Sequence, residues 1–201
     1  MSWRAWLVAY LRHEARPAHK FSHQPRLYAL AQQIATLERL AYDDDVVFAA
    51  AYLHDLGVFL GHRPEQPEAL AHWDHVAYVC NQAPPLLAQA GFPAHKIPAV
   101  LQVIRQHQPQ DEPTTAEATL LRDADILEQL GAIGLLRTAS KLGSDTRFHT
   151  LADVQRSLEK NMQQLPASIR LEATRALASP RLLLLQQFLA ALNHEAGEHL
   201  N

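Results

Sequence analysis

The residues of this chain best suited to chemistry are an adjacent histidine and aspartate, His54 and Asp55, at the end of the apolar stretch from Val46 to Leu53. Such a stretch turns its side chains into a protein core, where an imidazole and a carboxylate are unfavourable unless a partner compensates them. A divalent cation is one such partner, because histidine nitrogens and carboxylate oxygens are common metal ligands. One adjacent pair is weak evidence by itself, since it could equally cap a helix or face solvent.

Two further residues strengthen the interpretation as a metal site. His23 stands at the predicted start of a helix, and Asp125 lies within an apolar helical segment that also holds Leu121, Ile126 and Leu130. An unpaired carboxylate buried there would cost on the order of several kcal/mol, so Asp125 needs a cation or a hydrogen-bonded partner. Two imidazoles and two carboxylates suit one divalent metal, which could be Mn, Mg, Fe, Co, Ni or Zn.

Helix-forming residues dominate the chain, glycines are few, and no long β-branched stretches alternate with polar ones. The composition therefore predicts an all-α helical bundle. Prolines and capping residues predict where the helices that carry the candidate ligands begin and end. We expect helices from Pro25 to about Leu40, from the acidic run at 43–45 to the His54–Asp55 pair, from Ala69 to Asn81 before Pro84 and Pro85, and from near Pro93 to His107.

The second half of the sequence predicts further helices. Thr114 and Glu117 have the spacing of a capping box, which would open the longest helix and carry it through Asp125 to Gly131 or beyond. The terminal helices are expected to begin near Thr150, Pro166 and Ser179.

Length and composition narrow the class of protein. The 201 residues, 48% of them apolar, suit one domain spanning 1–201 with a sizeable core. The formal net charge of −3 offers no broad basic face for nucleic acid, and no apolar run is long enough to span a membrane. Cys80 is the only cysteine, so an intramolecular disulfide is excluded and a reducing, cytoplasmic setting is expected. The oligomeric state is not readable from the sequence.

The order His23, His54 with Asp55, then Asp125 resembles the H, HD, D signature of the HD-domain metal-dependent phosphohydrolases. The segments AHKFSHQPRLYALA, AAYLHDLG and LLRDADILEQLGAIGLLR resemble that family's first, second and last motifs. Within the last motif, the DAD start and the GAIG segment are similar to those of the small stand-alone bacterial branch of the family. The resemblance covers about 19–137 and implies an HD-type helical bundle, with C-terminal helices at 149–197 packing on it.

The resemblance also implies roles for individual residues. Asp125 matches the metal aspartate of the last motif, and Asp123 is then displaced from the metal, because residues two apart on a helix do not point the same way. The implied metal ligands are His23, His54, Asp55 and Asp125, and the implied catalytic residues are Asp55, His72 and His107. The candidate substrate-binding residues are Arg26, Arg122, Asp123 and His75, the last of which could serve beside His72 or replace it.

The expected activity is hydrolysis of a phosphoester or phosphoanhydride by a metal-activated water, with a small phosphorylated molecule such as a nucleotide as substrate. Two alternatives stay open. One is an HD-type oxygenase with two irons, to which His72 and His107 would supply extra ligands. The other is a sensor domain that binds metal or nucleotide without turnover. Lys20, which stands where the family often has an aspartate, favours the sensor, and Val58 stands where many members carry a lysine.

Overall fold

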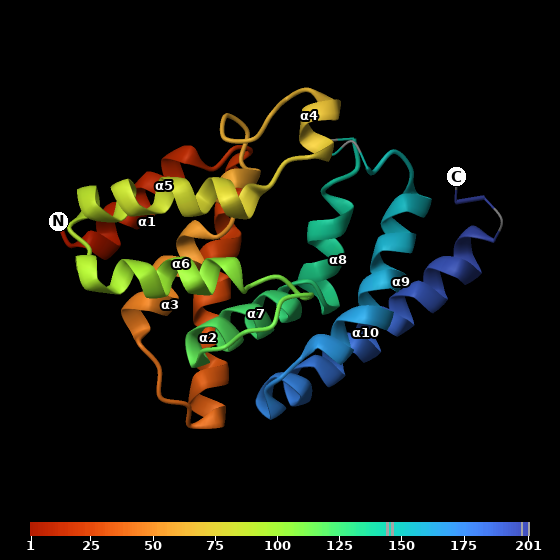
Figure 1. The fold of residues 1–201 in the computed structure, drawn as a ribbon. Coiled ribbons are helices and arrows are strands. Elements are labelled where there is room, and N and C mark those ends of the chain that lie inside the picture. The colour runs from red at the N-terminus through yellow and green to blue at the C-terminus, as the bar shows by residue number, and fades with distance from the viewer. Residues whose placement is uncertain (144, 146, 198, 201) are drawn as a thin grey trace. The chain divides into compact units, whose positions relative to one another are not determined.

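The computed structural model describes residues 1–143, 145, 147–197 and 199–200. These residues form helices and connecting turns without a β-strand, which confirms the all-α prediction (Figure 1). Their contacts group into two compact units, Met1–Arg122 and Asp123–Asn201, and the division falls within helix α7 (Ala116–Glu128). The single-domain organisation, with the C-terminal helices packed on the motif-bearing core, stays a prediction. In the described part of the chain, no helix combines the length and hydrophobicity needed to cross a bilayer.

Helix α3 is the centre of the first unit. It contacts α1, α2 and α6, and every residue from Val46 to Leu53 on it is buried. A helix that is apolar on all sides must be covered on all sides, which explains the central position of this segment. The helices of the unit are α1 (Trp3–Glu14), η1 (Ala18–Ser22), α2 (His23–Glu38), α3 (Asp44–Leu53), η2 (Leu56–Val58), α4 (Pro67–Ala71), α5 (His75–Ala90), η3 (Ala94–Lys96) and α6 (Ile97–Arg105).

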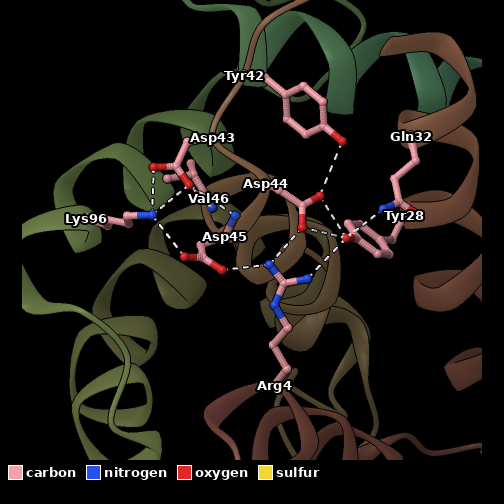
Figure 2. A network of polar contacts seen from close by, with 9 residues as sticks. All are labelled: Arg4, Tyr28, Gln32, Tyr42, Asp43, Asp44, Asp45, Val46 and Lys96. Atoms are coloured by element: carbon pink, nitrogen blue, oxygen red, sulfur yellow. Dashed lines mark hydrogen bonds and ion pairs between the residues drawn. The ribbon is translucent and has the colours of Figure 1, made fainter. Parts of the chain in front are cut away.

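The first turn of α3 is capped by acidic side chains, as the sequence predicts. The carboxylate of Asp43 accepts hydrogen bonds from the backbone N–H groups of Asp45 and Val46. Lys96, which ends η3, lies 2.9 Å from carboxylate oxygens of both Asp43 and Asp45 (Figure 2). Negative charge at a helix N-terminus is favourable because it faces the positive end of the helix dipole. The cap therefore stabilises α3 and also ties it to the segment before α6.

Helices α1 and α2 reach the same turn of α3. The guanidinium of Arg4 on α1 lies 2.7 Å from a carboxylate oxygen of Asp44 and 2.6 Å from one of Asp45. The hydroxyl of Tyr28 on α2 donates to Asp44 at 2.8 Å (Figure 2). The Arg4 guanidinium also lies over the ring of Phe48. These contacts fix one end of α3 against three other elements, and so fix where its other end presents the histidine and aspartate.

This network is expected to make folding sensitive to acid. Hydrogen bonds from Arg4 and then Lys96 hold the pKa of Asp45 below its ordinary value of about 3.8. Because the folded-state pKa is the lower one, the stabilisation is present above pH 4 and is lost as the pH falls through the folded pKa. Arg4→Gln should lower the free energy of unfolding by about 1 kcal/mol at pH 7, and by less at pH 3. Urea unfolding at both pH values measures the difference.

The exposed Arg16 provides the control for that experiment, because Arg16→Gln removes the same charge outside the network. A loss of stability in Arg4→Gln that is as large at pH 3 as at pH 7 would contradict the proposed link to the carboxylates.

Helix α5 corrects the prediction for residues 69–81. The predicted helix is divided into α4 and α5, and α5 begins at His75 after Asp74, whose side chain accepts from the N–H of Ala77. It then continues through Pro84 and Pro85, which were expected to end it. Proline removes a helical hydrogen bond, but α5 packs on α1 and α6, and that burial outweighs the loss. The buried side chains are Val79, Cys80, Ala83 and Leu87.

Helix α7 begins slightly later than the predicted capping box. The hydroxyl of Thr115, not of Thr114, accepts the N–H of Ala118, while the carboxylate of Glu117 accepts the N–H of Asp43. The first turn of α7 is thereby attached to the start of α3. The helix ends at Glu128, and a new helix starts at Gly131, whose φ of +70° breaks the helical path.

The second unit contains α8 (Gly131–Ala139), α9 (Leu151–Ser168) and α10 (Glu172–Ala196), which contact one another. The predicted start at Thr150 is confirmed, since Thr150 and Asp153 form a capping box. The predicted starts at Pro166 and Ser179 are wrong, because Pro166 lies inside α9, and residue 179 lies inside α10. The prediction that the helix through Asp125 is the longest is also wrong, since α10 has 25 residues and α7 has 13.

Candidate metal centre

His54 caps the C-terminal end of α3 and is 1% exposed. Its Nδ1 lies 3.0 Å from the carbonyl oxygen of Ala51, which can only accept a hydrogen bond. The ring proton of neutral His54 is therefore on Nδ1, and Nε2 carries a lone pair. A ring nitrogen of this kind can serve as a metal ligand.

The Nε2 atom of His54 lies close to two other potential ligand atoms. It is 3.3 Å from Nε2 of His23, the first residue of α2, and 3.5 Å from Oδ2 of Asp55. The distance from Nε2 of His23 to Oδ2 of Asp55 is 3.7 Å. Donors about 2.1 Å from one ion lie about 3.0–3.4 Å from each other, so the three atoms are spaced nearly as a shared cation requires. Two imidazoles and one carboxylate therefore fit a divalent metal.

Two more histidines extend this group into a row of rings. His107 is 3% exposed, and its Nδ1 lies 2.6 Å from the carbonyl oxygen of Ile104, so its Nε2 also carries a lone pair when the ring is neutral. Its ring centroid is 5.0 Å from that of His54, and the ring of His75 is 6.1 Å from that of His107. His75 thus joins the row, which runs through His23, His54, His107 and His75.

His72 lies outside the row of rings, and its catalytic role stays a prediction. It is the C-terminal cap of α4 and is exposed, and its ring takes part in none of the ring contacts found among the described residues. It lines an open pocket together with His75. The structure therefore favours His75 over His72 as the histidine beside His107.

Arg122 and Asp123, the predicted substrate-binding residues of the last motif, have backbone partners in the structure. Arg122 is 2% exposed, and its guanidinium donates to the backbone carbonyls of Gln108 and Pro109. This side chain fixes the loop that follows His107. Asp123 is fully buried and accepts the backbone N–H groups of Arg170 and Leu171, 2.8 Å away in the latter case. Both side chains bond to backbone groups, because buried donors and acceptors require partners. The substrate-binding roles of the two residues stay predictions.

Asp125 is half-buried on α7, three residues after Arg122, and accepts a hydrogen bond from Gln129 at 3.1 Å. Residues two apart on a helix differ by about 200° in direction, so the buried side chain of Asp123 leaves Asp125 facing elsewhere. The ligand role of Asp125 stays a prediction. Arg26 is half-buried one turn after His23 on α2, and its predicted contact with substrate is likewise untested.

The turn that follows Asp55 is held by two side chains whose roles the sequence did not reveal. Nζ of Lys20 donates to the carbonyl oxygen of Val58 at 2.9 Å, and Nε1 of Trp73 donates to that of Gly57 at 2.8 Å. Gly57 itself lies against the first residue of α5, where a Cβ atom would be 2.9 Å from the carbonyl oxygen of His75. Lys20 and Val58, the two residues that depart from the family pattern, are therefore hydrogen-bonded to each other.

The model of the HD domain family matches residues 21–130, which is more than half of the chain. The chain belongs to the HD-domain family. This confirms the resemblance read from the three motifs. Members of this family bind divalent metals, and His23, His54 and Asp55 supply a group that could bind one. Among curated proteins, no sequence matches the chain.

Several solved structures share this HD-domain fold. YpgQ of Bacillus subtilis is 20% identical with a TM-score of 0.71, over 97% of this chain and 96% of that one. The structure of the same protein in complex with ADP is 21% identical with a TM-score of 0.70, and the match covers 96% of this chain and 98% of that one. A protein described as a predicted HD superfamily hydrolase, from an uncultured Thermotogales bacterium, is 26% identical with a TM-score of 0.64, over 95% and 91%. Family and neighbours together support a metal-dependent hydrolase.

Proposed function

We propose that this protein is a metal-dependent phosphohydrolase that acts on a nucleotide or a related phosphoester or phosphoanhydride. The observation that carries the proposal is the convergence of two Nε2 atoms and one carboxylate oxygen, from His23, His54 and Asp55, within 3.3–3.7 Å of one another. A nucleotide is favoured as substrate because the structurally similar YpgQ binds ADP in its crystal structure. We also propose a cytoplasmic location, consistent with the single buried free cysteine, Cys80.

Four residues form the proposed ligand set: His23, His54, Asp55 and Asp125. The first three are supported by their mutual distances. Asp125 is supported by the order of the H, HD and D motifs, and by the engagement of Asp123 with backbone N–H groups of the second unit. Four protein ligands leave open positions on a metal that prefers six, where water and a substrate oxygen can bind.

The bound metal would act as a Lewis acid that makes water nucleophilic near neutral pH and stabilises charge on the phosphoryl oxygens. The protein contributes orientation and proton transfer. The bond from Nδ1 of His54 to the Ala51 carbonyl holds that ring in one tautomer. The carboxylate of Asp55 can accept a proton from the attacking water, and Nε2 of His107 can exchange one with the substrate. Arg26 would offset negative charge on the phosphoryl group.

A substrate panel tests the function directly. Protein purified without an affinity tag, depleted of metal with EDTA and reconstituted with Mn²⁺, should hydrolyse bis(p-nitrophenyl) phosphate and at least one nucleoside mono-, di- or triphosphate. The same protein kept in EDTA should hydrolyse none of them. Reconstitution with Mg²⁺, Co²⁺, Ni²⁺, Zn²⁺ or Fe²⁺ in parallel identifies the metal that supports turnover.

The alternatives give different results in the same experiment. Two irons per chain with near-ultraviolet absorption and no phosphate release would favour the oxygenase. The exposed position of His72 weighs against that reading, since it removes one of the extra ligands. Nucleotide binding without hydrolysis in any metal would favour the sensor. Its main support was Lys20, which the structure bonds to the carbonyl of Val58.

A further inference from the structure

An open pocket of about 470 Å³ lies at the start of α5 in the first unit. The residues of its lining that matter here are Trp73, Asp74, His75, Arg105, Gln108 and Asp111. Its volume is in the range of about 300–1,000 Å³ that small-molecule sites enclose. The lining is mainly polar and combines hydrogen-bond donors with acceptors.

The pocket adjoins the candidate metal centre. His75 is part of its wall, and the ring of His75 contacts that of His107, which in turn contacts that of His54. A substrate whose phosphoryl group lies at His54 therefore has its remaining atoms within reach of this pocket. Nε2 of Gln108 lies 3.4 Å from Nε2 of His75, so both lie on the same wall.

Two carboxylates in the lining, those of Asp74 and Asp111, each accept a backbone hydrogen bond at one oxygen only. Oδ1 of Asp74 accepts the N–H of Ala77, and Oδ2 of Asp111 accepts the N–H of Gln108. For the second oxygen of each, the described residues provide no hydrogen-bond partner. The backbone bonds fix one oxygen of each carboxylate, and the second oxygen is an acceptor on a residue that lines the pocket.

We propose that this pocket binds the sugar of the substrate, through hydroxyl groups that donate hydrogen bonds to Asp74 and Asp111. Arg105 and Gln108 supply donors to oxygens of the sugar or the base, and the side chain of Trp73, fixed by its bond to Gly57, offers an apolar surface. The inference rests on the proposed function, because it names the part of a nucleotide that lies away from the reacting phosphorus.

The charges of the pocket favour a sugar over a phosphate. A phosphate group has only acceptor oxygens at neutral pH and would meet two carboxylates with a single arginine to balance them. Sugar hydroxyls instead are donors, and a charged acceptor makes a hydrogen bond about twice as strong as a neutral one. A site arranged for hydroxyl groups discriminates against analogues that lack them.

The test compares adenosine, 2′-deoxyadenosine and 2′,3′-dideoxyadenosine nucleotides of equal phosphate number, with bis(p-nitrophenyl) phosphate as a substrate without sugar. For the natural sequence, loss of both hydroxyls should lower kcat/KM about tenfold or more. In Asp74→Asn/Asp111→Asn this discrimination should fall to about twofold, while hydrolysis of bis(p-nitrophenyl) phosphate stays within about twofold of the unchanged protein. Asparagine retains the backbone caps, because its carbonyl oxygen accepts the same N–H groups.

A matched control removes the same charge outside the pocket. Glu65 and Glu68 are exposed and do not line it, so Glu65→Gln/Glu68→Gln should keep the full preference for the hydroxyl-bearing substrate. Calorimetric titration of ADP and its 2′,3′-dideoxy analogue in EDTA gives a readout that needs neither metal nor turnover.

The outcomes separate the pocket from the reaction. If nothing is hydrolysed but ADP binds about tenfold more tightly than its dideoxy analogue, and the double asparagine variant loses that difference, the sugar site stands and the hydrolase proposal fails. If nucleotides are hydrolysed without regard to the hydroxyls, or the variant keeps the full discrimination, the sugar site is overturned and the hydrolase stands. The comparison in the natural sequence decides the matter even if the variant does not fold.

Discussion

Replacing His54 with alanine is expected to remove the metal and to lower kcat/KM for phosphoester hydrolysis by at least about a thousandfold. Its Nε2 is the atom nearest to both other potential ligands, 3.3 Å from that of His23 and 3.5 Å from Oδ2 of Asp55. Alanine removes the imidazole closest to both neighbouring donors, and leaves one imidazole and the partly exposed carboxylate of Asp55, with Asp125 as the proposed third ligand, which is too weak a set to bind a divalent ion tightly. Elemental analysis of untagged protein gives the metal content, and steady-state kinetics with bis(p-nitrophenyl) phosphate gives the rate.

His19 provides the matched control for this substitution. It is exposed on η1, four residues before His23, so His19→Ala removes a histidine from the same segment without touching the row of rings. It should keep the metal content and the rate of the unchanged protein. A His54→Ala protein that holds one metal per chain and retains more than a tenth of the activity would contradict the proposed site. Asp125→Asn, measured in the same way, tests the fourth ligand separately.

The residues of the candidate metal centre stand out in the sequence because they break a strong pattern. A histidine and an aspartate at the end of a continuous apolar run are conspicuous, and the run itself predicts that the helix is buried on all sides, as α3 is. The caps were equally local signals: Asp43 and Thr150 act through N–H groups only two or three residues away. Such features depend on neighbouring residues and are therefore visible in the sequence.

Two of the differences from prediction concern partners that are distant in the sequence. Pro84 and Pro85 remain inside α5 because α1 and α6 cover it, and no local rule contains that contact. Arg122 and Asp123 carry charges within the last motif, and each bonds to backbone groups 13–48 residues away. Backbone carbonyls and N–H groups are present at nearly every position, so the sequence does not show which of them needs a side-chain partner.

Gly57 connects the candidate metal centre to the proposed sugar pocket through a close contact with the backbone of His75. A Cβ atom at this position would lie 2.9 Å from the carbonyl oxygen of His75, 3.0 Å from its Cβ and 3.1 Å from its Cα. Two of these three atoms belong to the backbone of α5 and cannot move aside by a change of rotamer. The carbonyl of Gly57 also accepts the indole N–H of Trp73. Gly57 is therefore bonded to Trp73 and packed against His75, two residues further along the same segment.

Gly57→Ala is therefore expected to lower the free energy of unfolding by about 2 kcal/mol, because the start of α5 must retreat from η2. The same displacement would move His75 away from His107, and misplacement by about 1 Å can cost up to about a hundredfold in rate. We expect kcat/KM for nucleotides to fall at least about tenfold while one metal per chain is retained, since His23, His54 and Asp55 keep their positions. Urea unfolding, elemental analysis and nucleotide kinetics measure the three quantities.

Gly61 separates the effect of contact from the effect of losing a glycine. Apart from its two chain neighbours, no described residue has an atom within 4 Å of a Cβ built at Gly61. Its φ of +92° makes asparagine the replacement that a left-handed conformation tolerates best. Gly61→Asn should leave nucleotide hydrolysis near the rate of the unchanged protein. If Gly57→Ala is as stable and as active as Gly61→Asn, the contact between η2 and α5 does not position His75, and the link from the reaction centre to the pocket fails with it.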